Sequence, residues 1–249
     1  MRAVRVAVAG LLAVGVASTW SAGAEARTSA ADLRPQHRAA NDVVRLRLRA
    51  AVRSLPVGRE RRAGYDRDKF NLWIDADGDC LDTRAEVLTE ESLTPVTGDC
   101  SIETGRWYSY YDAVTWTRAS DVDIDHLVPL AEAWDSGART WTSKTRERYA
   151  NDLGDRRTLV AVTDNVNESK GDQDIAEWLP DHGRCRYVRE WTAVKTRWSL
   201  RVDRREKQAM KRLAGGCPNR PIRVRMAVVR HQAQAASPAR AQPRAGPQV

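Results

Sequence analysis

Four cysteines set the strongest limit on how this chain can fold: Cys80, Cys100, Cys185 and Cys217. No two of them have the Cys-x-x-Cys spacing of a zinc knuckle, which argues against a structural zinc site. An even number of cysteines in an exported protein is typical of disulfides. Four cysteines can form two disulfides in three ways. We expect the pairing of sequence neighbours, Cys80 with Cys100 and Cys185 with Cys217.

The N-terminus indicates export, the condition under which such disulfides form. Arg2 and Arg5 precede an uncharged apolar run from Val6 to Ala17. Ala24-Glu25-Ala26 then places small residues at the positions that a signal peptidase reads. The run of about a dozen residues is shorter than the roughly 20 that cross a bilayer. We therefore expect residues 1–26 to be a signal peptide, cleaved near Ala26, and the secreted chain to have no membrane span. An uncleaved N-terminal anchor is the alternative.

The net charge of +8 is concentrated near the C-terminus. Residues 218–249 carry six arginines and no acidic residue, and they are rich in Pro, Ala and Gln. This composition predicts a disordered basic tail. With the tail and the signal region set aside, residues 27–217 carry a net charge near +1. A high pI often indicates nucleic-acid binding. Here the net charge does not distinguish a nucleic-acid-binding protein from other classes, because an arginine tail can equally increase solubility.

Residues 27–217 are enough for one domain with a sizeable core. We divide them into a basic segment, 27–64, and a domain, 65–217. The basic segment is expected to be helical over 32–62, because Ala and Arg dominate it. The domain is expected to mix helices with short strands. Strands are expected at 70–74, 122–128 and 158–162, with a hairpin at 105–116. Helices are expected at 83–93, 130–135, 143–151, 187–200 and 203–215, and a turn or helix at 165–171.

An acidic segment around the first cysteine imitates a calcium loop. Asp75, Asp77, Asp79 and Glu86 have offsets close to those of calcium ligands. However, Cys80 occupies the position where such a loop needs glycine. We expect a tight acidic turn that is pinned by a disulfide, and we keep bound calcium as the alternative.

The stretch Asp123-Ile124-Asp125-His126 carries the clearest chemical signal. Side chains alternate along a strand, so Asp123 and Asp125 share one face and His126 points to the other. Carboxylate oxygens suit a hard cation such as Mg²⁺, and a neutral imidazole can accept a proton from water near pH 7. A strand end with a buried, hydrogen-bonded histidine is the structural alternative.

A second polar segment follows about 40 residues later, after the expected strand at 158–162. There Asn167 offers a neutral oxygen ligand, and Lys170 offers a mobile cation for a phosphate. A hairpin between the two strands would let these side chains reach back to the first segment.

Together these segments resemble the HNH fold. Asp-Ile-Asp-His-Leu-Val-Pro-Leu (123–130) and Asn-Glu-Ser-Lys-Gly-Asp (167–172) are similar to the HNH domain of RNA-guided CRISPR nucleases. The wider pattern resembles a secreted actinobacterial HNH family that is related to the C-terminal domain of GmrSD-type restriction endonucleases. Four flanking segments carry this wider resemblance, which covers about residues 65–217: Tyr-Asp-Arg-Asp-Lys-Phe (65–70), Cys-Leu-Asp-Thr-Arg-Ala-Glu-Val-Leu (80–88), Ala-Trp-Asp-Ser-Gly-Ala (133–138) and Tyr-Ala-Asn-Asp (149–152).

The resemblance implies an α+β fold in which a ββα-metal core is embedded in a mainly helical single domain. It also implies a monomeric, metal-dependent endonuclease that hydrolyses phosphodiester bonds in double-stranded DNA, or alternatively in RNA. His126 would be the general base for water. Asp125 and Asn167 would hold one divalent cation, with Asp123 as a further ligand or a support for the ligands. Asn151 would orient the histidine or a loop.

The resemblance has one departure and leaves some roles open. Asn167 stands where the HNH motif usually ends in histidine, and this favours Mg²⁺ or Mn²⁺ over zinc. Lys170 would act at the phosphate. Arg84 would contact phosphate or form a local ion pair. A non-catalytic module that keeps the fold and binds polyanions or the cell envelope is the alternative function, although the complete set of Asp125, His126 and Asn167 argues against it.

Overall fold

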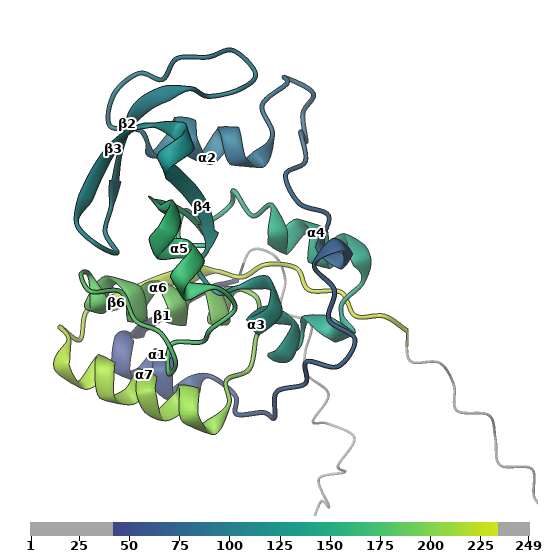
Figure 1. Ribbon diagram of the computed structural model, residues 1–249. Helices are drawn as coiled ribbons and strands as arrows, with labels where there is room; N and C mark the ends of the chain where they lie inside the picture. The colour runs from purple at the N-terminus through teal and green to yellow at the C-terminus, as the bar shows by residue number, and fades with distance from the viewer. Residues whose placement is uncertain (1–41, 234–249) are drawn as a thin grey trace, which may run out of the picture. The chain divides into compact units, whose positions relative to one another are not determined.

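The computed structural model describes residues 42–233, so the expected signal peptide and the last residues of the tail lie outside it. Within this part of the chain, seven α-helices and three two-stranded antiparallel sheets form a mixed α+β structure with two disulfides (Figure 1). The longest α-helix among these residues, α6 (Arg184–Arg197), has 14 residues, and none of the helices is long and apolar enough to span a membrane.

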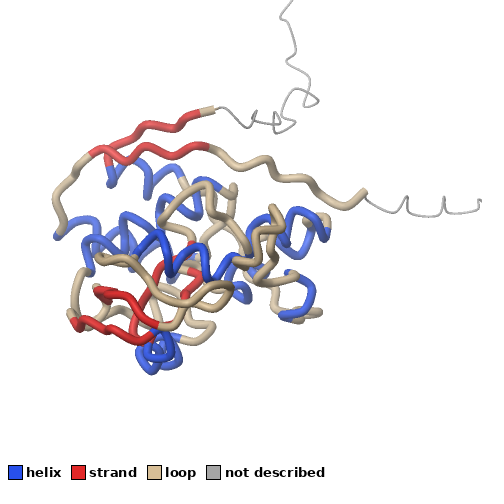
Figure 2. The backbone as a smooth tube through the Cα atoms, turned by 90° about the horizontal axis from the view of Figure 1, so that it is seen from above, coloured by secondary structure: helices blue, strands red, loops and turns tan. Residues whose placement is uncertain are grey.

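The first and last strands of the described chain pair with each other. β1 (Val43–Arg47) runs antiparallel to β6 (Pro221–Arg225), as Figure 2 shows. In β6, Ile222 and Val224 are buried while the residues between them are exposed. The arginines of both strands therefore follow a two-residue period, which belongs to a strand rather than a helix.

This pairing corrects two expectations. Within residues 42–64, the described part of the basic segment, the α-helix is limited to α1 (Leu48–Ser54), and residues 27–41 lie outside the described residues. The tail is ordered at least to residue 233, because β6 has a partner strand. Beyond β6, the backbone amide of Thr142 donates to the Arg230 carbonyl (2.9 Å).

Most other elements confirm the sequence prediction. α2 (Thr83–Glu91) begins at Asp82, whose carboxylate accepts from the Ala85 amide. β2 (Thr104–Ser109) and β3 (Val114–Arg118) form the expected hairpin. The remaining helices of this group are α3 (Leu130–Asp135), α4 (Ser143–Ala150), α6 and α7 (Arg204–Gly216). The expected strand at 70–74 is wrong, because a 3₁₀ turn, η2 (Arg67–Phe70), is followed by an irregular loop.

A strand–strand–helix unit lies at the centre of the domain. β4 (Val122–His126) pairs antiparallel with β5 (Leu159–Thr163), so that Asp125 faces Val160 and His126 faces Leu159 across the ladder. α5 (Asp164–Lys170) follows β5 directly and lies beside β4 in Figure 1. All five residues of β5 are buried, which explains its continuous apolar sequence.

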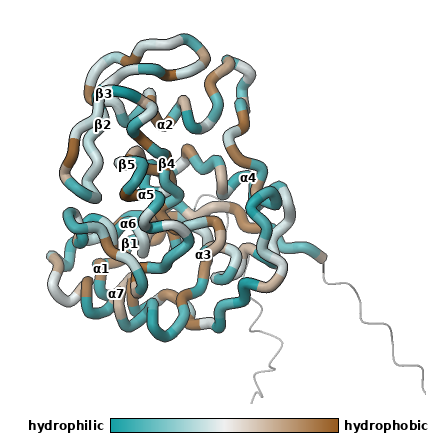
Figure 3. Tube along the Cα trace, viewed as in Figure 1, coloured by the Kyte–Doolittle hydropathy of each residue, from teal (hydrophilic) through white to brown (hydrophobic). Residues whose placement is uncertain are grey.

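Aromatic side chains from several helices form the main core. Tyr187, Trp191 and Trp198 of the α6 region are at most 1% exposed, and Trp198 packs against Tyr149 with ring centroids 5.3 Å apart. In Figure 3, hydrophilic and hydrophobic residues alternate along α7, as expected for a helix with one buried face. This core provides the rigid base on which β4 and α4 are fixed.

Both disulfides have the expected pairing. Cys80 is bonded to Cys100, and Cys185 to Cys217. In the acidic turn before Cys80, the Asp75 carboxylate accepts from the amides of Gly78 (2.8 Å) and Cys80 (3.0 Å). The turn is therefore closed by its own hydrogen bonds and by a disulfide, and bound calcium stays an untested alternative.

Candidate active site

Polar contacts from two residues of α5, Asn167 and Lys170, join this helix to β4. Nδ2 of Asn167 lies 3.0 Å from Oδ2 of Asp123, and Nζ of Lys170 lies 2.7 Å from Oδ1 of Asp125. Asn167 and Lys170 are three residues apart on one helix face, and Asp123 and Asp125 share one strand face. The expected alternation along β4 is therefore present, and the two halves of the motif lie together.

The contact between Lys170 and Asp125 is buried away from water. Lys170 is 0% exposed and Asp125 is 5% exposed. The Tyr111 hydroxyl donates to Oδ2 of Asp125 (2.5 Å), and Lys170 also donates to the His126 carbonyl (3.1 Å). Burial raises the pKa of Asp125 and lowers the pKa of Lys170, while their mutual attraction opposes both shifts. Lys170 is thus a fixed, buried cation and not the mobile one that we expected.

His126 faces away from α5, into a pocket of aromatic and backbone groups. Its Nε2 lies 2.8 Å from the Ala150 carbonyl. A carbonyl can only accept, so Nε2 carries the proton and Nδ1 holds the free lone pair of the neutral ring. Burial lowers the pKa of His126 to about 3, with smaller contributions from Arg67 and Lys170. The ring is therefore neutral near pH 7, with its free lone pair at Nδ1, and its lowered pKa makes that nitrogen a weaker base than an exposed imidazole.

A strained loop holds a tryptophan against this histidine. Asn71 and Trp73 have φ of 46° and 53°, in the left-handed region that non-glycine residues rarely adopt. The Trp73 ring lies 5.5 Å from the His126 ring, centroid to centroid. Tyr149 stacks on the histidine as well, at 6.3 Å.

Asn151 fixes that loop with both ends of its amide. Its Oδ1 accepts from the Ile74 amide (3.2 Å), and its Nδ2 donates to the Asn71 carbonyl (2.8 Å). Of the two roles expected for Asn151, the contacts fit the one at the loop. Sequence reasoning missed Trp73, and the only available signal was Asn71, because asparagine tolerates the left-handed conformation better than most residues.

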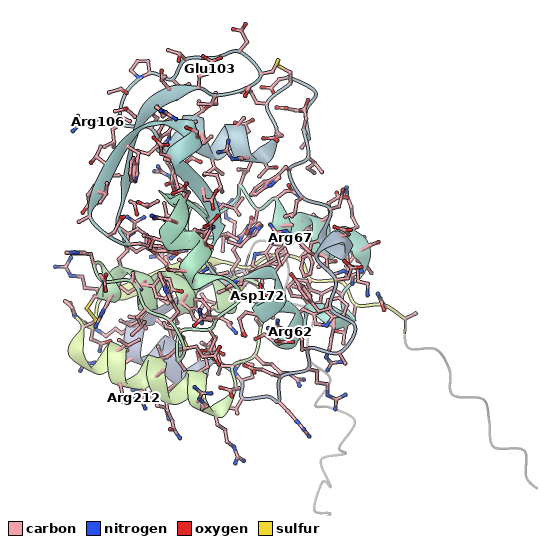
Figure 4. The ribbon with its side chains drawn as sticks, in the orientation of Figure 1. Arg62, Arg67, Glu103, Arg106, Asp172 and Arg212 are labelled. Atoms are coloured by element: carbon pink, nitrogen blue, oxygen red, sulfur yellow. A yellow bond between two sulfur atoms is a disulfide. The ribbon has the colours of Figure 1, made fainter. Side chains whose placement is uncertain are left out.

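The two arginines near the site differ from expectation. Nη2 of Arg84 donates to the carbonyls of Ala119 (3.1 Å) and Val122 (3.0 Å), so Arg84 supports the turn into β4. Among the described residues it has no ion pair, and its phosphate contact stays a prediction. Arg67, labelled in Figure 4, is exposed on η2 and acts electrostatically on His126. No pattern within the segment at 65–70 distinguishes Arg67 from its neighbours as a residue of the site.

The contact between Asp123 and Asn167 is the part of the site that fits a divalent cation. Asp123 and Asn167 are half-buried, and a turn of the Asn167 amide would direct its oxygen toward the Asp123 carboxylate. Both oxygens of Asp125 are already engaged, so Asp125 could act as a ligand only by sharing Oδ1 with Lys170 or Oδ2 with Tyr111. The donor set is oxygen-only, which suits Mg²⁺ or Mn²⁺ better than zinc.

Comparisons with known proteins show the family of this chain. An "uncharacterized secreted protein" of Arthroderma benhamiae is 47% identical over 157 residues, which are 62% of this chain and 76% of that protein. No solved structure matches the chain. Residues 81–213 match the family model described as the C-terminal domain of GmrSD restriction endonucleases, and this range includes β4, β5 and α5. The chain therefore belongs to the family of GmrSD restriction endonuclease C-terminal domains.

Proposed function

We propose that this protein is a secreted HNH-type endonuclease that hydrolyses phosphodiester bonds in DNA with the help of a divalent cation. The observation that carries the proposal is the strand–strand–helix unit. Asp123 and His126 lie on β4, and α5 brings Asn167 to Asp123. Family membership supports a nuclease, and the two disulfides together with the name of the fungal relative support export.

In this proposal His126 is the general base. Its Nδ1 accepts a proton from the attacking water, while the Nε2 contact to Ala150 keeps the tautomer and the ring orientation fixed. The rings of Trp73 and Tyr149 pack against the histidine ring and restrain its movement. The water oxygen then attacks phosphorus, the bond from phosphorus to the 3′ oxygen breaks, and this oxygen takes up a proton from solvent. We therefore expect 5′-phosphate and 3′-hydroxyl products.

The proposed cation ligands are Asp123 and Asn167, with Asp125 sharing one oxygen. A cation held there would supply positive charge to the phosphate as negative charge develops on it. Lys170 is then a positioning residue, because it touches Asp125 and the His126 carbonyl and lies away from solvent.

Plasmid nicking tests the proposal. The purified, oxidised protein should nick plasmid DNA with Mg²⁺ or Mn²⁺, and EDTA should stop the reaction. His126→Ala should lower the rate about 10²- to 10⁴-fold. His182→Ala is the matched control, because the His182 side chain is exposed in a turn and should leave the rate unchanged.

Two results would overturn parts of the proposal. Wild-type rates in His126→Ala would exclude His126 as the base. An oxidised, folded protein that cuts neither DNA nor RNA with any of these cations would be the non-catalytic polyanion-binding module instead.

A further inference from the structure

A surface rich in arginines, with Glu91 and Glu190 among them, lies outside the candidate site. Two adjoining hollows of about 420 Å³ and 320 Å³ share Arg157, Arg186 and Glu190 in their walls. Segments far apart in the sequence meet there: β2, the loop before β5, the start of α6 and the loop before β6. We call this surface the arginine trough and define it by Tyr108, Arg156, Arg157, Arg186, Arg189 and Arg220.

The arginines at one end of the trough carry charge that no acid neutralises. Arg156, Arg157 and Arg186 are each within 2.9 Å of a carboxylate, from Glu90, Asp155 and Glu190 respectively. Within residues 42–233, Arg189 and Arg220 have no ion pair. These two arginines line the larger hollow beside the Cys185–Cys217 disulfide.

The guanidinium of Arg189 is also poorly hydrogen-bonded. Its Nη1 is buried without a hydrogen-bond partner, and its Nη2 makes only a long contact of 3.5 Å to the Pro221 carbonyl. A buried donor without an acceptor costs free energy, and such an atom calls for an absent ligand or water. A rotation of the guanidinium within the hollow would bring it to a phosphate oxygen, the acceptor that arginine binds best after a carboxylate.

The other end of the trough presents an aromatic ring to solvent. Tyr108 is 49% exposed, and no other aromatic side chain belongs to the exposed large apolar residues of the described chain. Arg106, labelled in Figure 4, lies two residues earlier and is exposed as well, while Trp107 between them is buried. An exposed ring beside several cations is the combination that binds single-stranded nucleic acid, because any base can stack on the ring while the cations hold the backbone.

We propose that the arginine trough binds a single-stranded segment of nucleic acid, with phosphates at Arg189 and Arg220 and a base stacked on Tyr108. This inference rests on the proposed nuclease function, because it supplies a second contact that holds the substrate outside the cleavage site. The trough would favour substrates with an unpaired end or a locally open strand over a continuous duplex.

Fluorescence anisotropy with a labelled 20-nucleotide single strand, in EDTA so that no cleavage occurs, tests the trough on the full mature protein. Arg189→Ala/Arg220→Ala should raise Kd at least about 10-fold and reduce the slope of log K against log salt by about 1 to 2. Tyr108→Ala should raise Kd about 5- to 150-fold for the single strand, while Tyr108→Phe should bind like wild type. A duplex of the same length should show little effect of Tyr108→Ala.

A charge-matched variant on α7 controls for general electrostatics. Arg204 and Arg212 are exposed there, and Arg204→Ala/Arg212→Ala should change Kd less than twofold, provided that circular dichroism shows all variants folded. If the trough double variant binds no worse than this control, the trough proposal is wrong. If the trough binds as expected but wild type never cuts, the proposed nuclease function is wrong and the trough stands as a binding site.

Discussion

Two lysines of this protein are fully buried, and their surroundings differ. Lys170 lies between α5 and β4 and meets one carboxylate, that of Asp125, at 2.7 Å. Lys195 lies on α6 and meets two, from Glu132 on α3 and from Glu206 on α7. The Ser136 hydroxyl (2.6 Å) and the Arg201 carbonyl (3.0 Å) complete the surroundings of Lys195.

The difference shows in the pKa values. Burial opposes the charge of both lysines, but the two glutamates raise the pKa of Lys195, whereas the pKa of Lys170 is lowered. In the core, Lys195 joins three helices through Glu132 and Glu206, and burial raises the pKa of Glu206 to about 8, so Glu132 carries most of the opposing charge near pH 7. At the candidate site, Lys170 faces a single carboxylate, that of Asp125. We expect a charge that arrives nearby to alter the interaction of Asp125 with this lysine. The following predictions test this contrast, from the largest expected effect to the smallest.

Lys195→Met should be the most destabilising of the four changes. It leaves the Glu132 carboxylate buried without its cation, which costs about 3–5 kcal/mol of unfolding free energy. Urea denaturation followed by tryptophan fluorescence measures this loss. If Lys195→Met lost less unfolding free energy than Lys170→Met, the contrast drawn between the two buried lysines would be wrong.

Lys170→Met should cost less stability but more activity. The Tyr111 hydroxyl still donates to Asp125 and the carboxyl can take up a proton, so we expect a loss of about 2 kcal/mol. The nicking rate should fall at least about 10-fold, because Asp125 and the His126 carbonyl lose a shared partner. Rates are compared at a temperature at which both proteins are folded, and an unchanged rate would make Lys170 purely structural.

Glu206→Gln should change how stability depends on pH. Burial raises the pKa of Glu206 above its ordinary value of 4.5, although Lys195 opposes the shift. The carboxyl therefore ionises first in the unfolded chain, and the wild type loses stability as the pH rises from about 4.5 through neutrality. Glutamine cannot ionise, so the variant should lose about 1–2 kcal/mol less between pH 5 and pH 8.

Glu60, Glu91 and Asp174 also have raised pKa values, and they titrate in both proteins. The readout for Glu206 is therefore the difference between the two urea-denaturation curves across this pH range. Parallel curves would mean that Glu206 is ionised in the folded protein throughout.

Tyr111→Phe should have the smallest effect. It removes one hydrogen bond to Asp125 while Lys170 remains, so about 1 kcal/mol of stability is lost. The nicking rate should fall only a few-fold. A drop as large as that of Lys170→Met would show that the phenol, rather than the lysine, sets the position of Asp125.

The sequence predicted the parts of the site that depend on local pattern. The two-residue period of Asp123-Ile124-Asp125-His126 determined which side chains share a face. The polar run after the buried strand predicted a turn or helix at 165–171, and the structure has a helix there, α5. The same period, Arg-Leu-Arg at 45–47, was present in the basic segment, where helix propensity was given too much weight.

The remaining features depend on contacts between distant residues. Lys170 is buried because α5 packs on β4, and no property of residues 164–170 alone separates this from an exposed lysine. The left-handed backbone of Trp73 is imposed by Asn151, almost 80 residues away in the chain. Neither could be derived from propensity or spacing, because both are set by tertiary packing.

The pairing of β1 with β6 imposes an order on folding. Val43 pairs with Arg225, so the first strand of the domain has no partner until nearly the whole chain has been made. Closing so long a loop is slow relative to local helix formation. A chain that emerges N-terminus first therefore keeps this strand and the core beneath it unassembled until its last part arrives. The two ends of the described chain therefore pair last, and the closed domain forms only after residues 221–225 have become available to β1.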